Sequence, residues 1–293
     1  MLASLLSLIA IHNLAFPPAP TTSPYLPTPP PLLTNVAAYP EKSTLSPGPI
    51  LNAKSILSID LETGKILFGK NTEQKLPIAS LTKLMTILVI LDQHNPNEIV
   101  TVDKRATQVE PAKMYLLANE KITIQELIKA ILVKSANDAA LALAYYDSNS
   151  IEDFAKKMNA KAIEIGLKHT NFVNPVGFDN PDQYSTVDDL AILARLIYKN
   201  PLVKQFAPLT KTTANSVTGT PSHDLDTTND LLSSYLKVWG LKTGTTDLAG
   251  QCLISIVESP TGQKILNVML NSPARFTESK ILSQWIFDNY QWL

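Results

Sequence analysis

The order of strand-like and helix-like segments constrains the fold of this 293-residue chain more than any other feature. Residues 55–60 and 65–70 flank a turn at 61–64, a pattern that predicts a β-hairpin. Apolar, β-branched segments return much later, at 237–243, 251–258 and 264–271. A final amphipathic helix is expected near 277–290. The sequence therefore predicts an α+β fold, in which helices flank an antiparallel sheet assembled from both ends of the globular part, with an inserted, mostly helical region.

The middle of the chain carries the helical patterns. Pro77 precedes a strongly apolar stretch, residues 79–91, which predicts a central buried helix. A capping box at Thr123-Ile124-Gln125-Glu126 predicts the start of a helix that leads towards Ser135. Two further helices are expected, one over residues 150–165 and one that Ser185 or Thr186 caps and that runs through Tyr198.

The first 40 residues are of another kind, because they contain no Asp, Glu, Lys or Arg. Residues 1–16 are apolar but shorter than the ~20 residues of a membrane-spanning helix, which indicates a signal peptide or an N-terminal membrane anchor. The alternative is a buried helix of the folded domain. Eleven prolines between Pro17 and Pro49 argue against it, since they favour an extended chain. Residues 17–49 are thus a predicted proline-rich linker, and residues 50–293 the predicted folded domain.

Composition excludes several classes of function. The net charge is −1 and charged residues make up 17% of the chain, without a long basic run, so nucleic-acid binding by a basic surface has no support. Cys252 is the only cysteine, which excludes an internal disulfide and a cysteine-rich metal site. Neither a metal nor another cofactor is expected.

Three short strings lie in a fixed order: Ser80-Leu81-Thr82-Lys83, Ser135-Ala136-Asn137 and Lys242-Thr243-Gly244. Each alone has an ordinary interpretation, as a capping serine beside a surface lysine, a helix terminus and a turn after a strand. The first spacing even recurs at residues 234–237, whereas the other two strings occur once. Together they indicate a serine acyl-transfer site in which a lysine is the base.

Ser80 and Lys83 fit that chemistry if they lie on a helix, where residues three apart share a face. A serine hydroxyl is a poor nucleophile until a base takes its proton, and an ordinary lysine, with a pKa near ~10.4, is protonated at neutral pH. The pKa of Lys83 must therefore fall by about three units, which burial and a second cation could achieve. Lys242 is the candidate second cation.

The other two strings supply polar groups for a peptide substrate. The Ser135 hydroxyl can relay a proton to a leaving amine. The Asn137 amide could hold either the catalytic lysine or a substrate amide, since it offers a donor and an acceptor. On a probable strand, the cation of Lys242 and the hydroxyl of Thr243 suit a substrate with a free carboxylate, while Gly244 permits a close approach to the backbone.

With these strings in this order, the chain resembles the low-molecular-mass penicillin-binding proteins, which are serine D-alanyl-D-alanine carboxypeptidases. The resemblance extends from about Ala53 to Tyr290. Beyond the three strings, four further segments carry it, at residues 174–179, 184–186, 228–232 and 249–253. It implies a β-lactamase/transpeptidase-like fold.

The resemblance also implies roles for the candidate residues. Ser80 would be acylated with Lys83 as its base, and the backbone N–H groups of Ser80 and Thr245 would form the oxyanion hole. Proton transfer and substrate holding would fall to Ser135 and Asn137. The terminal carboxylate would be bound by Lys242 and Thr243, with Gly244 and Thr245 completing the substrate-binding strand.

The implied activity is release of the terminal D-Ala from peptidoglycan stem pentapeptides, outside the cytoplasmic membrane. β-Lactam antibiotics would be covalent inhibitors, and membrane contact would occur only through the N-terminal segment if it is not cleaved. Three different functions stay open: a D,D-endopeptidase that cleaves cross-links, a class A-like β-lactamase, and a non-catalytic peptidoglycan-binding scaffold. A lactamase needs a glutamate between the second and third strings, where only Glu152 and Glu164 occur.

Overall fold

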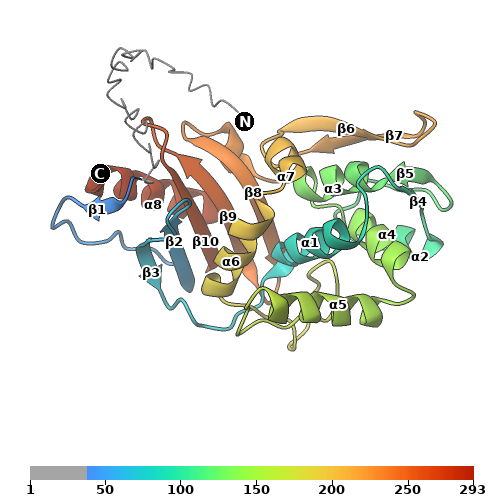
Figure 1. Ribbon diagram of the computed structural model, residues 1–293, viewed down its shortest axis with the longest axis horizontal. Coiled ribbons are helices and arrows are strands. Elements are labelled where there is room, and N and C mark those ends of the chain that lie inside the picture. The colour runs from blue at the N-terminus through green and yellow to red at the C-terminus, as the bar shows by residue number, and fades with distance from the viewer. Residues whose placement is uncertain (1–37) are drawn as a thin grey trace, which may run out of the picture. The chain divides into compact units, whose positions relative to one another are not determined.

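The computed structural model describes residues 38–293, and Figure 1 shows their course. The predicted signal peptide or anchor at 1–16, and the predicted linker as far as residue 37, lie outside the described residues. None of the helices within residues 38–293 has the length and apolar character that a bilayer span requires.

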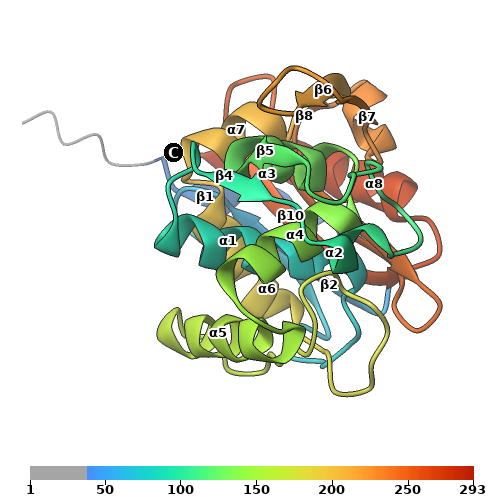
Figure 2. The same ribbon diagram turned by 90° about the vertical axis from the view of Figure 1, so that its right-hand side faces the viewer.

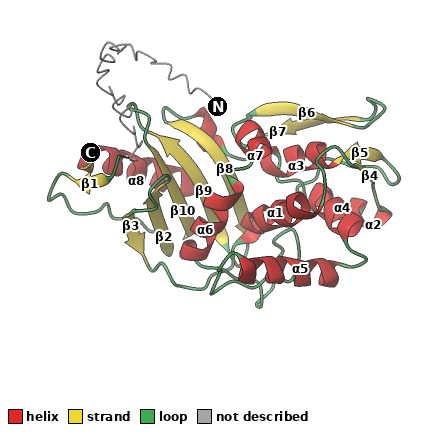
Figure 3. Cartoon of the chain, viewed as in Figure 1, coloured by secondary structure: helices red, strands yellow, loops and turns green. Residues whose placement is uncertain are grey.

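Five antiparallel strands form the main sheet, in the order β3-β2-β10-β9-β8. The first two come from the beginning of the chain and the last three from its end, as the sequence predicts (Figure 3). Their bounds are β2 Ser55–Asp60, β3 Ile66–Lys70, β8 Lys237–Thr246, β9 Gly250–Glu258 and β10 Lys264–Ser272. In this order β8 is an edge strand, so part of its backbone is not bonded to another strand of the sheet.

Most of the elements between β3 and β8 are helices, which confirms the predicted insertion (Figures 1 and 2). They are a 3₁₀ turn η1 Ala79–Thr82, α1 Lys83–Gln93, α2 Lys104–Thr107, α3 Ile124–Val133, α4 Asn137–Asp147, α5 Ile151–Glu164, α6 Val187–Ile197, α7 Pro201–Phe206 and a 3₁₀ turn η2 Asp230–Ser233. Two small two-stranded sheets accompany them, with strands β4 Ile99–Thr101, β5 Lys121–Thr123, β6 Lys211–Asn215 and β7 Ser222–Asp226. The last helix is α8 Arg275–Asn289.

Both faces of the main sheet are buried, because the two faces of β10 pack against different elements. Leu266 and Val268 belong to a large core that includes α1 and α6, whereas Ile265 and Met269 pack in a smaller core with Leu282 of α8. This alternation follows from the two-residue period of a strand. The sheet therefore separates α8 from the helical region.

Helix α3 starts where the sequence predicts, but the predicted capping box does not form. Thr123 occupies the N-cap of α3, but its hydroxyl makes no cap hydrogen bond and is buried without a partner within residues 38–293. The Glu126 carboxylate does not reach back to Thr123; it accepts hydrogen bonds from Lys129 Nζ and from the backbone N–H of Asn215 in β6. The capping-box prediction is wrong because the Glu126 carboxylate is hydrogen-bonded to the neighbouring strand β6 instead. Thr186 caps α6, as predicted, and Ser150 caps the predicted helix α5.

The folded part begins earlier than Ile50, the predicted start. Residues Pro40–Lys42 form β1, which pairs with β11 Tyr290–Trp292. Backbone hydrogen bonds between Tyr39 and Leu293 extend this pair at its open end, at 3.0 and 3.1 Å. The proline count of residues 17–49 conceals this short strand, because its pairing partner lies some 250 residues away in sequence.

Candidate functional site

Ser80 lies on η1, at the point where the chain enters the buried helix α1. The sequence places Ser80 in the first turn of an α-helix, whereas the α-helix begins only at Lys83. In a 3₁₀ turn, residues three apart lie almost directly above one another. The Lys83 amine is accordingly 2.7 Å from the Ser80 hydroxyl oxygen, a direct hydrogen bond.

A loop after α5 holds the Lys83 amine from another direction. The backbone carbonyl of Val176 accepts a hydrogen bond from Lys83 Nζ at 2.7 Å. Asn174 Oδ1 accepts hydrogen bonds from the N–H groups of Val176, Gly177 and Phe178, and so fixes the shape of this loop. Gly177 is required there: its φ is +92°, and a β-carbon would lie 1.9 Å from the backbone oxygen of Ala79. Lys83 is thus gripped between its own helix and this loop.

The surroundings of Lys83 favour the neutral amine. Burial lowers the pKa of Lys83 well below its usual value, the positive charge of Lys242 lowers it further, and the Asp138 carboxylate opposes both. Lys242 is itself buried, and burial together with the charge of Arg275 lowers its pKa to about 7. The two causes that the sequence proposes for an activated Lys83, burial and the nearby Lys242, are both present.

The edge strand β8 lies against the backbone of η1. A β-carbon on Gly244 would lie 2.9 Å from the backbone nitrogen of Ser80, so only a glycine permits this approach. The Thr243 hydroxyl is 2.6 Å from that of Thr228, which precedes η2. The structure therefore brings the first and third strings of the sequence together around the Ser80 backbone N–H.

The second string lies between two helices of the inserted region. Ser135 has a φ of +58° and connects α3 to α4. Asn137 is the first residue of α4, and its side-chain NH₂ donates to the Pro111 carbonyl, which leaves Oδ1 as the free acceptor of the amide. No hydrogen bond within residues 38–293 joins Ser135 or Asn137 to Ser80 or Lys83. Their link to the site is through the neighbouring Asp138, whose charge acts on Lys83.

Arg275 is a component of this site that the sequence did not single out. It is the first residue of α8, and its Nη1 donates to the Gly244 carbonyl at 2.7 Å and to the Thr245 hydroxyl at 2.6 Å. Its Nε is buried without a partner in the described part of the chain. No local motif marks this arginine, because its role depends on the sheet order that carries the start of α8 to β8.

The arrangement can activate a hydroxyl and bind an anion side by side. A neutral amine at the Ser80 oxygen can accept its proton, while Thr243 and the two cations Lys242 and Arg275 offer donors to a carboxylate. Among residues 38–293, no three His, Cys, Asp or Glu side chains are grouped so that they could hold a metal ion.

Comparisons with known proteins agree with this geometry. Residues 41–274 match the model of the family Peptidase_S11, D-alanyl-D-alanine carboxypeptidase. The D-alanyl-D-alanine carboxypeptidase DacF of Bacillus subtilis is 38% identical over 206 residues, 69% of this chain and 53% of DacF. The D-alanyl-D-alanine endopeptidase of Escherichia coli is 28% identical over 87% of this chain and 84% of its own length.

The same likeness is found among solved structures. The Streptomyces K15 DD-transpeptidase superimposes with a TM-score of 0.77 at 29% identity, over 83% of this chain and all of the transpeptidase. The predicted penicillin-binding, transpeptidase-like α+β fold is therefore confirmed. The chain spans about half the length of DacF, so the match concerns the part that contains the three strings. Because the family model covers most of the described residues, the chain belongs to the D-alanyl-D-alanine carboxypeptidase family, Peptidase_S11.

Proposed function

We propose that this protein is a serine D-alanyl-D-alanine carboxypeptidase, which removes the terminal D-Ala from peptidoglycan stem pentapeptides. The observation that carries the proposal is the 2.7 Å hydrogen bond between Lys83 Nζ and Ser80 Oγ, at a lysine whose pKa is lowered by burial and by Lys242. A lysine in that state is a general base already in contact with its nucleophile.

In the proposed reaction, Lys83 takes the proton of Ser80 as the serine oxygen attacks the carbonyl between the last two D-Ala residues. The N–H groups of Ser80 and Thr245 stabilise the oxyanion. The departing amine of D-Ala receives a proton, which the Ser135 hydroxyl relays. Water then hydrolyses the ester on Ser80 and releases the shortened peptide.

Substrate recognition is assigned to the β8 side of the site. The terminal carboxylate of D-Ala would lie against Lys242 and Thr243, with Arg275 as a further donor, and Gly244 would let the peptide lie along β8. The Asn137 Oδ1 atom would accept a hydrogen bond from a substrate amide. The same contacts would direct β-lactam antibiotics to Ser80, where they would form a stable acyl-enzyme.

The decisive experiment measures free D-Ala released from a Lys-D-Ala-D-Ala peptide by the purified chain. Release that is lost in Ser80→Ala supports the proposal. If the protein releases none but cleaves a cross-bridge between two stem peptides, the endopeptidase assignment replaces it; the likeness to the Escherichia coli endopeptidase makes this the second candidate.

Fluorescent penicillin distinguishes a carboxypeptidase from a β-lactamase and from a non-catalytic scaffold. A carboxypeptidase keeps a stable label, a β-lactamase turns the label over, and a scaffold takes none. The structure disfavours the lactamase because neither glutamate that the sequence offers faces Ser80. Glu164 is exposed at the end of α5 and pairs with Lys161, and Glu152 is exposed in the first turn of that helix.

A peptidoglycan substrate places the action of the enzyme outside the cytoplasmic membrane, in the periplasm or cell-wall space. Residues 1–16 would direct export or anchor the chain, with residues 17–49 as the connecting segment. Mass spectrometry of the protein from the cell envelope tests this, because a cleaved signal peptide shortens the chain and an anchor leaves it intact in the membrane fraction.

A further inference from the structure

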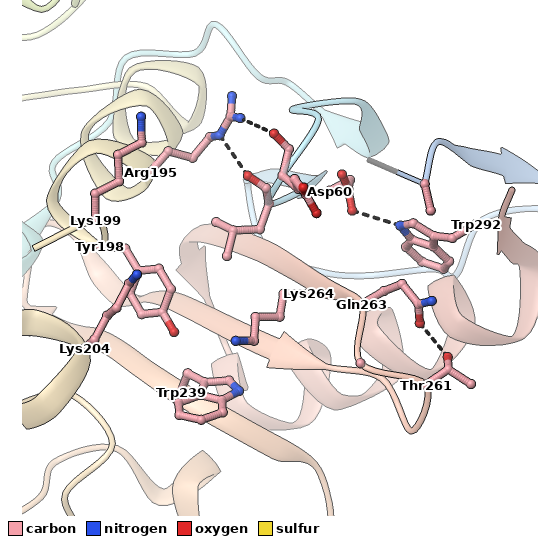
Figure 4. Close-up of a pocket in the computed structure, with 14 residues that line it drawn as sticks. Asp60, Arg195, Tyr198, Lys199, Lys204, Trp239, Thr261, Gln263, Lys264 and Trp292 are labelled. Carbon is pink, nitrogen blue, oxygen red and sulfur yellow. Dashed lines mark hydrogen bonds between the residues drawn. The ribbon is translucent and has the colours of Figure 1, made fainter. Parts of the chain in front are cut away.

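A cavity lies near the start of β8, at the end of the strand away from the Ser80 site. Its volume is about 810 Å³, a size common for small-ligand sites. Trp239, near the start of β8, lines it, whereas Gly244 at the Ser80 site is five residues further along the strand, a separation of about 16 Å at the usual rise of a strand. The lining residues come from the turn after β2, the end of α6, α7, the β9–β10 turn and β11 (Figure 4). This basic cavity is separate from the Ser80 site.

The charge of the lining is predominantly positive. Four of its residues are cationic and two are anionic: Arg195, Lys199, Lys204 and Lys264 against Asp60 and Glu62. Asp60 is already occupied, because it accepts hydrogen bonds from Thr63 and from Trp292. The Arg195 guanidinium donates only to the backbone carbonyls of residues 61 and 62 within the described chain, so no carboxylate neutralises it there.

Two exposed lysines add charge that residues 38–293 do not balance. Lys199 and Lys204 are exposed, and neither forms a salt bridge within the described residues. Lys264 is 3.5 Å from Glu258, but that carboxylate is also bonded to Lys237 and to the Trp239 indole. An anion that enters the basic cavity would thus meet ammonium groups still available for direct contact.

Tyr198 provides a hydrogen-bond donor on the wall of the cavity. Only 7% of its surface is exposed, yet its hydroxyl has no hydrogen-bond partner within residues 38–293. In Figure 4 the phenol extends towards the side of the cavity that holds Lys204, Trp239 and Lys264. Burial and the charge of Glu258 raise the pKa of Tyr198, so the hydroxyl keeps its proton and can donate it. The hydroxyl oxygen is not among the solvent-inaccessible atoms that lack a partner in the described chain, so it is open to the cavity and can donate to a bound acceptor.

The aromatic rings indicate to which kind of chemical group the anion is attached. The Trp239 indole is held by a 2.7 Å hydrogen bond to Glu258, and the Trp292 indole by a 2.9 Å hydrogen bond to Asp60. Lys264 lies 4.5 Å from the centre of the Trp239 ring, a cation–π contact that also fixes the ammonium group. Rigid indoles beside hydrogen-bonding groups suit a ring with an apolar face and polar edges, which is the character of a sugar.

We propose that the basic cavity binds a negatively charged saccharide, with its anionic group at Lys199, Lys204, Lys264 and the Tyr198 hydroxyl and its sugar ring against the indoles. The anion can be a carboxylate, as on a muramic acid residue without a stem peptide, or a phosphate, as on a sugar-phosphate polymer. Both sources share the same chemistry.

Binding of three sugars to the full-length protein by isothermal titration calorimetry tests the proposal. N-acetylmuramic acid supplies the carboxylate, N-acetylglucosamine 1-phosphate the phosphate, and N-acetylglucosamine is the neutral control. We expect at least one anionic sugar to bind tenfold or more tightly than the neutral one, and the tighter of the two identifies the source. Because no catalysis is measured, this proposal and the proposed function can fail separately.

Variants locate the binding. Lys199→Gln with Lys204→Gln should weaken binding at least tenfold, and Tyr198→Phe, which removes only the hydroxyl, about threefold to tenfold. The matched control is Lys54→Gln with Lys168→Gln, which makes the same change in net charge at exposed positions outside the cavity and should change nothing.

Several outcomes would overturn the assignment. Equal affinity for the neutral and both anionic sugars, or an equal loss in the control double variant, removes the basic cavity as the site. If inorganic phosphate binds as tightly as the sugar phosphate, the sugar ring does not contribute to binding and the ligand is not a saccharide. Phosphatidylglycerol vesicles that bind through Lys199 and Lys204, when none of the sugars does, would make the cavity a membrane contact.

Discussion

Two groups of buried ionisable side chains differ in whether they have a partner of opposite type. Lys83 and Lys242 have no salt bridge within residues 38–293, and their pKa values are lowered by burial and by a nearby positive charge in each case. Glu120, which precedes β5, and His223 of β7 are also buried, but they are bonded to each other at 2.9 Å. The other ring nitrogen of His223 contacts the Met114 carbonyl, and Ser216 donates to Glu120.

The contrast separates reactivity from stability. Burial of a cation without an anionic partner raises the free energy of the charged form. The pKa of the group is therefore lowered, and it gives up its proton more easily. A buried pair whose hydrogen bonds are satisfied holds two segments together and performs no chemistry. We therefore expect substitutions in the two groups to have opposite effects on activity and on folding.

The largest effect is expected at Lys83. Lys83→Met keeps the length of the side chain and removes the base, so acylation by fluorescent penicillin should slow by about 10²–10⁴-fold. The same variant should unfold at a higher temperature than the wild type, because removing a buried amine that has no carboxylate partner outweighs the loss of its hydrogen bonds to Ser80 and Val176. A faster or unchanged acylation rate in Lys83→Met would refute the role of this lysine as base.

The opposite result is expected at Glu120. Glu120→Ala leaves a ring nitrogen of His223 without its partner, and a buried polar group that loses its partner lowers the free energy of unfolding by about 1–3 kcal/mol. Urea denaturation measures this, with Glu73→Ala as the control at an exposed carboxylate, where the change should stay within about 0.5 kcal/mol. If the two variants are equally stable, the Glu120–His223 pair does not hold the hairpin.

A smaller effect is expected from pH. The pKa of Lys242 is about 7, so the folded protein loses this charge as the pH rises through 7. The proposed positive partner of the substrate carboxylate is then present below that pH and lost above it. Between pH 6 and 8 the protonated fraction falls about tenfold, and KM for Lys-D-Ala-D-Ala should rise by up to that factor. In Lys242→Arg the guanidinium stays charged, so an identical pH profile in both proteins would exclude Lys242 as the titrating group.

The smallest effect concerns a hydroxyl pair. Thr228→Val removes the 2.6 Å hydrogen bond to Thr243 while preserving the shape of the side chain. Loss of one neutral hydrogen bond corresponds to about 0.5–1.5 kcal/mol, so kcat/KM for the peptide should fall by about twofold to tenfold. The stability of this variant should stay near that of the wild type, and a loss confined to stability would make Thr228 purely structural.

The pattern of apolar residues in the sequence was sufficient to predict the main sheet and most of the helices. The strands of β8, β9 and β10 are long and apolar, and the caps of α5 and α6 are local signals, so both were predictable. The contacts that fail prediction are those made across the fold. Glu126 bonds to Asn215 rather than to Thr123, and residues 40–42 find a partner only in the last strand.

The site divides in the same way. Ser80 and Lys83 were predictable as a pair because residues three apart in one helical turn lie on the same face. The Val176 carbonyl that grips Lys83 has no side-chain signature, and Arg275 reaches Gly244 only because α8 starts beside the edge strand. The left-handed backbone of Ser135 is also invisible in its sequence, since a serine there carries none of the usual signals for a positive φ.

The pairing of β1 with β11 has a mechanical consequence. The two strands are antiparallel, with Pro40 opposite Trp292 and Tyr39 bonded to Leu293, so the two ends of the described chain leave the pair at the same point. A force that draws residues 38 and 293 apart would load these hydrogen bonds one after another rather than all at once. The pair would open as a zipper at low force, while the five-stranded sheet that carries the Ser80 site would not yet bear the load.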